Sequence, residues 1–207
     1  MIQPFSSKFL TPTTKYRNMS VLMAVHDFPE ISQEKIAGIT HLSSSMVNNY
    51  IKSLRREGSL NVTGDTNRTQ RYHVTTKGQS ILTTSLLSYS AEIVQMFGAA
   101  KREIAGILND FYEDDIRTVA MFGVADTAEI VYLAIKESSL VVIGVGDSDV
   151  NKRGKPFNGL IIQPPEALKK MRPDAIVISS FGKQEEIQER IRQIGCKDTK
   201  VIRLSDV

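Results

Sequence analysis

Residues 43–58 read SSSMVNNYIKSLRREG and predict a helix with one apolar and one polar face. Val47, Ile51 and Leu54 follow one another at steps of four and three, so they share one side of a helix. Ser43 is a suitable N-cap, because its hydroxyl can accept a hydrogen bond from a backbone N–H of the first turn. The segment therefore predicts a helix that packs its apolar side inward and leaves the other side to solvent.

Two shorter helices are expected before this segment. Residues 16–28 and 33–40 both place apolar side chains at helical spacing. Pro29 separates them, because proline cannot continue the first helix, and Ser32 can cap the second. Gly58 ends the third helix, since glycine readily adopts the left-handed conformation that often follows a helix. The N-terminal part of the chain is therefore expected to begin with three helices.

Two short extended runs follow, residues 60–63 and 71–75, joined by the polar loop 64–70. The loop contains Gly64 and Asp65, which favour turns, so the two runs predict a β-hairpin. Three helices followed by a hairpin predict a winged helix-turn-helix domain over residues 1–78.

The outward face of the third helix carries the first candidate functional residues. In a helix-turn-helix the second helix of the pair lies in the major groove of DNA, and here that is the helix of residues 43–56. Its outward face carries hydrogen-bonding side chains and lacks a carboxylate, which phosphate would repel. Asparagine can pair with adenine, and serine can contact bases or phosphates. The candidate DNA-binding residues on this face are Ser44, Ser45, Asn48, Asn49 and Lys52.

The hairpin supplies the second group of candidates. Arg68 and Arg71 lie at or near its tip, from which arginine can reach a phosphate or the minor groove, and Lys77 follows its second strand. Residues 1–78 hold ten Lys/Arg and five Asp/Glu, whereas the remainder of the chain holds sixteen and eighteen. This asymmetry favours double-stranded DNA as the partner of the basic half. Two alternatives stay open: a merely solvated charged surface, and a winged helix that contacts other proteins.

The same half of the chain resembles the bacterial MarR-like winged-helix repressors. The resemblance is carried by the residues Ser32–Ala37, Leu42–Leu54, Glu57–Leu60 and Tyr72–Gly78, and it covers roughly residues 16–85. It implies a dimeric transcriptional regulator, and a repressor is the form that we expect.

Residues 79–115 are expected to form a linker and dimerisation helix. The stretch 79–112 contains no proline, and its apolar residues recur at steps of three or four. A small winged helix cannot cover so long a stripe, so we expect the helix to pack on its copy in a homodimer. The alternative is a linker helix that lies on the second domain. Gly98 and Gly106 leave open whether the helix is continuous.

Residues 116–207 alternate between apolar runs rich in β-branched residues and helical segments. The expected strands are 118–122, 140–145, 160–162, 175–179 and 200–204, and the expected helices are 127–136, 165–170 and 183–194. Strands that are apolar on both faces and alternate with helices indicate a parallel sheet covered on both sides. The fold class predicted for the whole chain is therefore α/β with two domains, the second being a doubly wound, Rossmann-like sheet.

The turn after the first of these strands resembles a dinucleotide fingerprint, with Gly123, Ala125 and Ala128 at its three glycine positions. Asp147 follows the second strand, 24 residues after Gly123, where an acidic residue would hold a ribose hydroxyl. The alternative is an ordinary loop carboxylate. The candidate cofactor-binding residues at this sheet edge are Gly123, Val124, Ala125, Asp147 and Ser179, with Ser180 and Phe181 beside them.

The run from Asp147 to Gly159 is similar to one in two kinds of Rossmann-like domain. One kind occurs in sugar-nucleotide enzymes of polysaccharide synthesis, and the other in the redox-sensing Rex repressors, which join a winged helix to an NADH-binding domain. The similarity spans about residues 117–205. It implies a ligand-responsive repressor whose effector is a nucleotide or a sugar nucleotide, without specifying NADH.

Enzymatic chemistry and metal binding find little support in the residues. His26, His41 and His73 lie in separate elements, and Ser179 and Ser180 have no neighbouring histidine that could act as a base. One cysteine and the absence of a signal peptide or long apolar run suit a cytoplasmic protein. We therefore expect no enzyme. Two alternatives remain, a nucleotide-sugar enzyme with an accessory winged helix and an assembly module with a ligand-free sheet domain.

Overall fold

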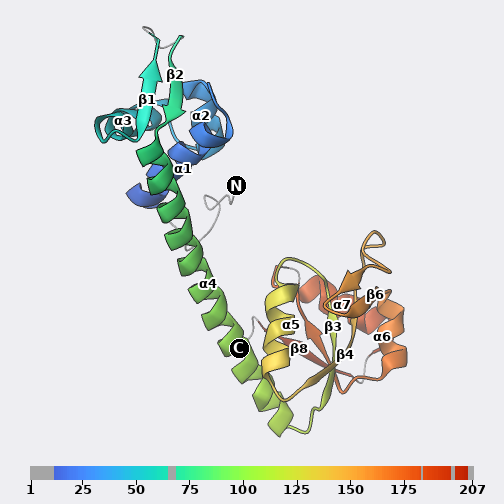
Figure 1. Ribbon diagram of the computed structural model, residues 1–207. Coiled ribbons are helices and arrows are strands. Elements are labelled where there is room, and N and C mark those ends of the chain that lie inside the picture. The colour runs from blue at the N-terminus through green and yellow to red at the C-terminus, as the bar shows by residue number, and fades with distance from the viewer. Residues whose placement is uncertain (1–11, 65–68, 183, 197–198, 205–207) are drawn as a thin grey trace. The chain divides into compact units, whose positions relative to one another are not determined.

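The computed structural model describes residues 12–64, 69–182, 184–196 and 199–204 and confirms a mixed α/β chain (Figure 1). The chain divides into two compact units, residues 1–94 and 95–207, whose boundary falls inside one long helix.

The first unit contains the three predicted helices and the predicted hairpin. They are α1 Thr14–Asp27, α2 Gln33–Thr40, α3 Ser44–Arg56, β1 Leu60–Thr63 and β2 Arg71–Val74. The two strands pair antiparallel, with Leu60 opposite Val74 and Thr63 opposite Arg71. Apolar side chains from all five elements, together with Leu82 from the following helix, form one core. This core holds α3 on its apolar side, as the spacing predicts.

Helix α4 runs without interruption from Thr76 to Glu113, through Gly98 and Gly106. Its first turns contribute Leu82 to the core of the first unit, and its last turns contribute Ile104 and Leu108 to the core of the second. The turns between them carry large apolar side chains that are exposed: Leu86, Leu87, Ile93, Val94, Met96 and Phe97.

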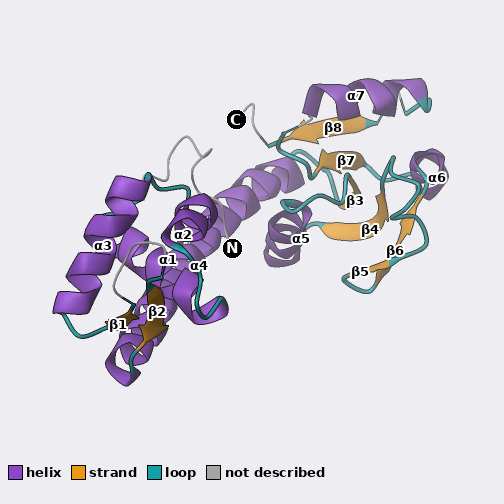
Figure 2. Ribbon diagram, turned by 90° about the horizontal axis from the view of Figure 1, so that it is seen from above, coloured by secondary structure: helices purple, strands orange, loops and turns teal. Residues whose placement is uncertain are grey.

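The second unit is built on a six-stranded sheet in the order β5-β6-β4-β3-β7-β8 (Figure 2). The strands are β3 Thr118–Phe122, β4 Val141–Gly146, β5 Pro156–Phe157, β6 Leu160–Gln163, β7 Ala175–Ile178 and β8 Lys200–Arg203, and the helices are α5 Ala128–Glu137, α6 Pro165–Met171 and α7 Gln184–Gln193. All neighbours pair parallel except β5, which runs antiparallel to β6. The predicted parallel sheet is thus confirmed, and the short edge strand β5 was not predicted.

Each face of this sheet has its own apolar core. The end of α4 and helix α5 cover one face, and helices α6 and α7 cover the other. Helix α6 packs closely on β4 at Gly144. A Cβ added to this glycine would lie only 2.3 Å from the Met171 sulfur. The strand order reverses between β3 and β7, since the chain moves outward from β3 through β4 and β6 and then returns to β7. The carboxyl ends of β3 and β7 therefore flank the switch point of the sheet, where α/β proteins commonly bind ligands.

Candidate nucleic-acid interface

Helix α3 is fixed in the first unit by its apolar side and by its first turn. Val47, Ile51 and Leu54 are buried in the core. The Ser43 hydroxyl accepts a hydrogen bond from the Met46 N–H at 3.3 Å, which caps the helix as the sequence predicts. These contacts determine which side of α3 faces solvent.

The turn between α2 and α3 is tight and held by hydrogen bonds. His41 ends α2 in the left-handed conformation, with φ at 54°, and the Leu42 N–H donates to the Ala37 carbonyl at 3.2 Å. The side-chain amide of Gln33, in the first turn of α2, donates to the Ser44 carbonyl at 3.3 Å. Helices α2 and α3 thus form the pair that a helix-turn-helix requires.

The outward face of α3 carries the predicted candidates. Ser44, Ser45, Asn49 and Lys52 are exposed, and Asn48 is half-buried. Arg55 and Arg56 are exposed as well, in the last turn of the helix. At about 100° per residue both arginines fall on the same arc as Ser44, Asn48 and Lys52. Neither arginine is among the residues predicted from the sequence, although their helical phase could have identified both.

The wing holds the other predicted contacts. Arg71 lies at the loop end of β2, where its Nε is 3.9 Å from a Glu30 carboxylate oxygen and its Nη1 donates to the Gln70 carbonyl at 3.0 Å. Lys77 is exposed, and its Nζ donates to the Glu57 carbonyl at the end of α3, at 2.7 Å. Arg68 lies outside the described residues. Arg71 and Lys77 therefore already have intramolecular partners, although both keep solvent-accessible surface.

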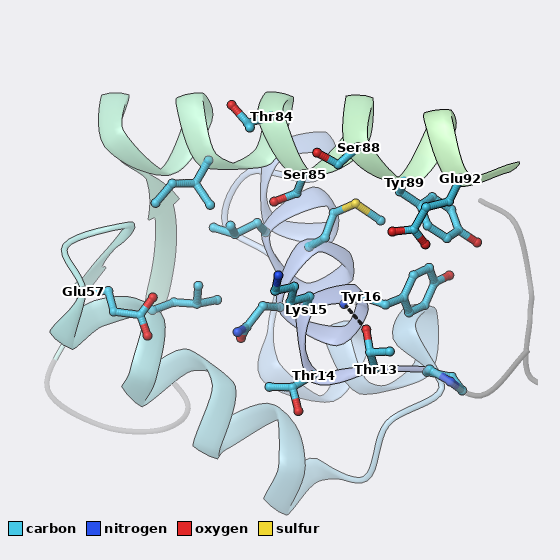
Figure 3. A pocket seen from close by; sticks show the side chains of 16 residues that line it. Thr13, Thr14, Lys15, Tyr16, Glu57, Thr84, Ser85, Ser88, Tyr89 and Glu92 are labelled. Atoms are coloured by element: carbon cyan, nitrogen blue, oxygen red, sulfur yellow. Dashed lines mark hydrogen bonds between the residues drawn. The ribbon is translucent and has the colours of Figure 1, made fainter. Parts of the chain in front are cut away.

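Behind α3 the first unit contains a pocket of about 990 Å³ between α1, the end of α3 and α4 (Figure 3). Its apolar part is lined by Met19, Leu22, Leu54 and Ile81, and its polar part includes Lys15, Thr84, Ser85, Ser88 and Glu92. Tyr16 and Tyr89 meet at one end with ring centroids 5.1 Å apart. Burial raises the pKa of Tyr89, and Tyr16 and Glu92 raise it further, so its phenol stays protonated. No local sequence pattern predicts this pocket, because its lining comes from three separate elements.

The second candidate site, at the carboxyl ends of the strands in the second unit, is closely hydrogen-bonded. Asp147 is 6% exposed, and its carboxylate accepts the Val124 N–H at 2.6 Å and the Asp149 N–H at 2.7 Å. Lys152 Nζ lies 3.3 Å from the same carboxylate and donates to the Val124 carbonyl at 2.6 Å. Of the predicted cofactor-binding residues, the structure thus brings Val124 and Asp147 into direct contact.

The remaining candidates lie on the β7 side of the same turn. The buried hydroxyl of Ser179 is within hydrogen-bonding distance of the carbonyls of Phe122, at 3.1 Å, and Gly123, at 2.5 Å. Gly123 adopts a positive φ of 98°, which supports the predicted need for glycine in this tight turn. Ala125 is exposed beside it.

Two features are absent from the described parts of the chain. No group of three or more His, Cys, Asp or Glu side chains there could hold a metal ion. Among the described residues, no helix has the length and apolar character needed to cross a membrane.

Comparison with known families covers the second unit. The family described as C2185-like, N-terminal, matches residues 115–202, which is less than half of the chain. No curated protein matches the chain.

Several solved structures of transcription regulators and DNA-binding proteins are similar to part of the chain. The regulator BldR from Sulfolobus solfataricus shares 20% identity over 40% of this chain and 60% of its own, with a TM-score of 0.37. The MarR family transcription regulator SP03579 shares 15% sequence identity over 47% of this chain and 71% of its own, with a TM-score of 0.36. Sso10a-2, a DNA-binding protein from Sulfolobus solfataricus, shares 18% sequence identity over 46% of this chain and 96% of its own, with a TM-score of 0.37. The chain spans less than two thirds of the length of BldR.

Proposed function

We propose that this protein is a DNA-binding transcription regulator whose recognition helix is α3. The observation that carries the proposal is the division of α3 into two sides. Val47, Ile51 and Leu54 are buried, and the opposite side offers amides, hydroxyls and cations to solvent without a carboxylate from Ser44 to Arg56. Such a surface is complementary to a groove lined by phosphates.

The two ends of α3 are proposed to have different roles. The side chains of the first turns, Ser44, Ser45, Asn48 and Asn49, would contact base edges, because the N-terminal part of a recognition helix lies deepest in the groove. Lys52, Arg55 and Arg56 would contact phosphates. Arg68, Arg71 and Lys77 are proposed as additional backbone contacts from the wing side. To reach a phosphate, Arg71 and Lys77 would have to exchange the partners described above.

A titration of labelled duplexes, followed by fluorescence anisotropy at several salt concentrations, tests DNA binding. We expect the affinity to fall steeply with salt, by a logarithmic slope of about −0.9 for each phosphate neutralised. A flat salt dependence, or no binding at low salt, would refute the proposal. Repression is the form of regulation that the family resemblance implies. Higher expression from the bound promoter when the protein is absent would support it.

We further propose that α4 pairs with α4 of a second copy. Its middle turns expose six large apolar side chains, among them Leu87 and Val94, which are 67% and 68% exposed. Large exposed apolar surfaces often bind another protein. The apolar stripe of α4 would be covered by the same stripe on α4 of a second copy. Symmetric homodimers are the most common assemblies, and two recognition helices would fit a palindromic operator.

Sedimentation equilibrium tests this pairing with matched lysine variants. Leu87→Lys with Val94→Lys places two like charges in each partner stripe, so we expect a monomer. Gln95→Lys with Ala99→Lys adds the same charge on the polar side of α4, and we expect it to remain dimeric. Equal behaviour of the two variants would exclude the proposed interface.

The pocket behind α3 favours a second, compatible role, the binding of a small effector. Its volume of about 990 Å³ lies in the range of small-molecule sites, and it combines an apolar lining with hydroxyls, two tyrosines and Lys15. Leu54 and Glu57 bring the end of α3 into its wall. A ligand there would contact the recognition helix from behind without blocking its DNA-binding face.

A screen of small amphipathic molecules by thermal shift, with and without Ser85→Trp, tests the pocket. Tryptophan at Ser85 would fill the pocket from α4, so any ligand that stabilises the unaltered protein should lose its effect. Gln95→Trp, on α4 but outside the lining and on the polar side of the helix, is the matched control. Stabilisation that survives Ser85→Trp would place the ligand elsewhere.

A further inference from the structure

When a doubly wound sheet binds a nucleotide, the polar groups of its first loop have to be available to the ligand. The backbone N–H groups of that loop must be free to receive the phosphates, and the acidic residue after the second strand must be free to receive the ribose hydroxyls. In this chain the corresponding groups are the N–H of Val124 and the carboxylate of Asp147. Whether these two groups are free therefore decides whether the sheet can hold a nucleotide.

These two groups bind each other. The Val124 N–H donates to Asp147 Oδ2 at 2.6 Å, and the other carboxylate oxygen accepts the Asp149 N–H at 2.7 Å. The ammonium group of Lys152 lies 3.3 Å from Oδ2 and donates to the Val124 carbonyl at 2.6 Å. The carboxylate is thus surrounded by two backbone N–H groups and one cation. Those are the partners by which proteins bind phosphate.

The opposite side of the loop is tied to β7. The Thr127 hydroxyl donates to the Ser179 carbonyl at 2.7 Å and lies 3.4 Å from the Phe181 N–H. Ser179 in turn contacts the carbonyls of Phe122 and Gly123. Hydrogen bonds therefore bridge the two strand ends that flank the switch point.

Little space is left at the turn itself. A Cβ added to Gly123 would lie 3.3 Å from the Ser180 Cβ and 3.3 Å from the Ile187 Cδ1, so the β7 loop and α7 already pack against it. Ala125 adds a methyl group where the fingerprint has its second glycine, the one that lets a pyrophosphate approach the backbone.

We infer that the Asp147 carboxylate is an internal ligand of this loop and occupies the place of a nucleotide phosphate. The residues present do not fit a bound dinucleotide or sugar nucleotide. Asp147 and Lys152 then serve to join the β3 and β4 loops, and the second unit does not sense nucleotides. DNA binding by the first unit enters none of these steps, so the two proposals can fail separately.

Chemical rescue tests the inference directly in the full-length protein. Asp147→Ala removes the carboxylate and frees the Val124 N–H and the Lys152 ammonium. We expect its melting temperature to fall, and we expect millimolar formate or inorganic phosphate to raise it again by occupying the vacated position. Unaltered protein should not respond to these anions at the same ionic strength, set with chloride. Asp149→Ala, which removes an exposed carboxylate two residues further along the same loop, is the matched control and should show no rescue.

A nucleotide panel provides the second measurement. NAD⁺, NADH, ADP and UDP-N-acetylglucosamine should leave the melting temperature of the unaltered protein unchanged, whereas a ligand at about 100 times its Kd would raise it by several degrees. A shift with any of them overturns the inference, as does formate rescue of Asp149→Ala equal to that of Asp147→Ala. If Asp147→Ala does not fold, two measurements on the unaltered protein decide: the nucleotide panel and the amide exchange of Val124, which should be slow.

Discussion

Removing the three cations of α3 should reduce the salt dependence of DNA binding by a calculable amount. Lys52, Arg55 and Arg56 are exposed on one arc of the helix, and we propose that each neutralises one phosphate. Each such contact contributes about 0.9 to the logarithmic salt slope, so a fourfold rise in salt weakens it by about 3.5-fold. Three contacts together account for about 40-fold, and their removal should lower the slope by about 2.7.

The assay is an anisotropy titration of the Lys52→Ala, Arg55→Ala, Arg56→Ala variant on one duplex between about 50 and 200 mM salt. Alanine favours the helix, so α3 should persist, and circular dichroism can verify this. The charge-matched control is Lys136→Ala, Lys155→Ala, Lys170→Ala, which removes three exposed cations from the second unit. If both variants change the slope equally, the effect is one of net charge and the assignment of α3 to the groove is wrong.

The remaining predictions concern other parts of the chain. Asn48→Ala with Asn49→Ala should alter the preference among duplex sequences while leaving the salt slope nearly unchanged, which a competition assay would show; a uniform loss on all sequences would contradict their proposed role. Leu108→Ala should destabilise the second unit by about 2–5 kcal/mol, because Leu108 is fully buried against the sheet, and calorimetry should show the transition of the first unit unmoved. Burial raises the pKa of the Cys196 thiol, so its reaction with a disulfide reagent at neutral pH should be slow until the protein is unfolded by denaturant; fast reaction in native buffer would count against this. Hydrogen bonds from the Thr118 and Arg117 N–H groups lower the pKa of Asp174, so its stabilising contribution should be present above about pH 4 and disappear as the pH falls through the lowered pKa. Melting curves of Asp174→Asn should therefore differ from those of the unaltered protein at neutral pH and converge with them in acid.

The elements of the fold follow from the sequence where the local pattern and the tertiary packing agree. The spacing of Val47, Ile51 and Leu54 predicts both the helix and its buried side, and the same periodicity carries α4 through Gly98 and Gly106. A single glycine costs about 1 kcal/mol in a helix interior, which the apolar contacts at the two ends of α4 outweigh. Strand β5 could not be predicted, because two residues give no periodicity and Pro156 argues against a strand except at an edge.

The candidate sites show the limit of arguments from spacing. The distance in sequence from Gly123 to Asp147 predicts a carboxylate placed to hold a ribose hydroxyl, whereas in the structure that carboxylate accepts the Val124 N–H. Spacing cannot tell whether such a carboxylate faces a ligand or the protein itself. Here the Lys152 ammonium group contacts both the Asp147 carboxylate and the Val124 carbonyl, and so helps to turn the carboxylate toward the protein. No periodic sequence pattern indicates this contact. The same limit applies to Lys77, since its position after the hairpin suggests a phosphate contact, yet its partner is the end of α3.

The contact of Lys77 with α3 also bears on how the first unit could respond to a ligand. Helix α3 is held at its start by the Gln33 side chain and at its end by the Thr75 hydroxyl and the Lys77 ammonium group. The Thr75 hydroxyl donates to the Gly58 carbonyl at 2.7 Å, and Lys77 donates to the Glu57 carbonyl at the same distance. Glu57 also lines the pocket behind α3. A ligand that binds more tightly when α3 is in one position than in another would therefore change the DNA affinity. The change can be at most the ratio of the ligand's affinities for the two positions. Lys77→Met removes one of these restraints and also a proposed phosphate contact. The coupling is therefore measured as the ratio of this variant's DNA affinities with and without ligand, and we expect that ratio to move toward one. If the coupling is unchanged, the end of α3 is not the element through which the pocket acts.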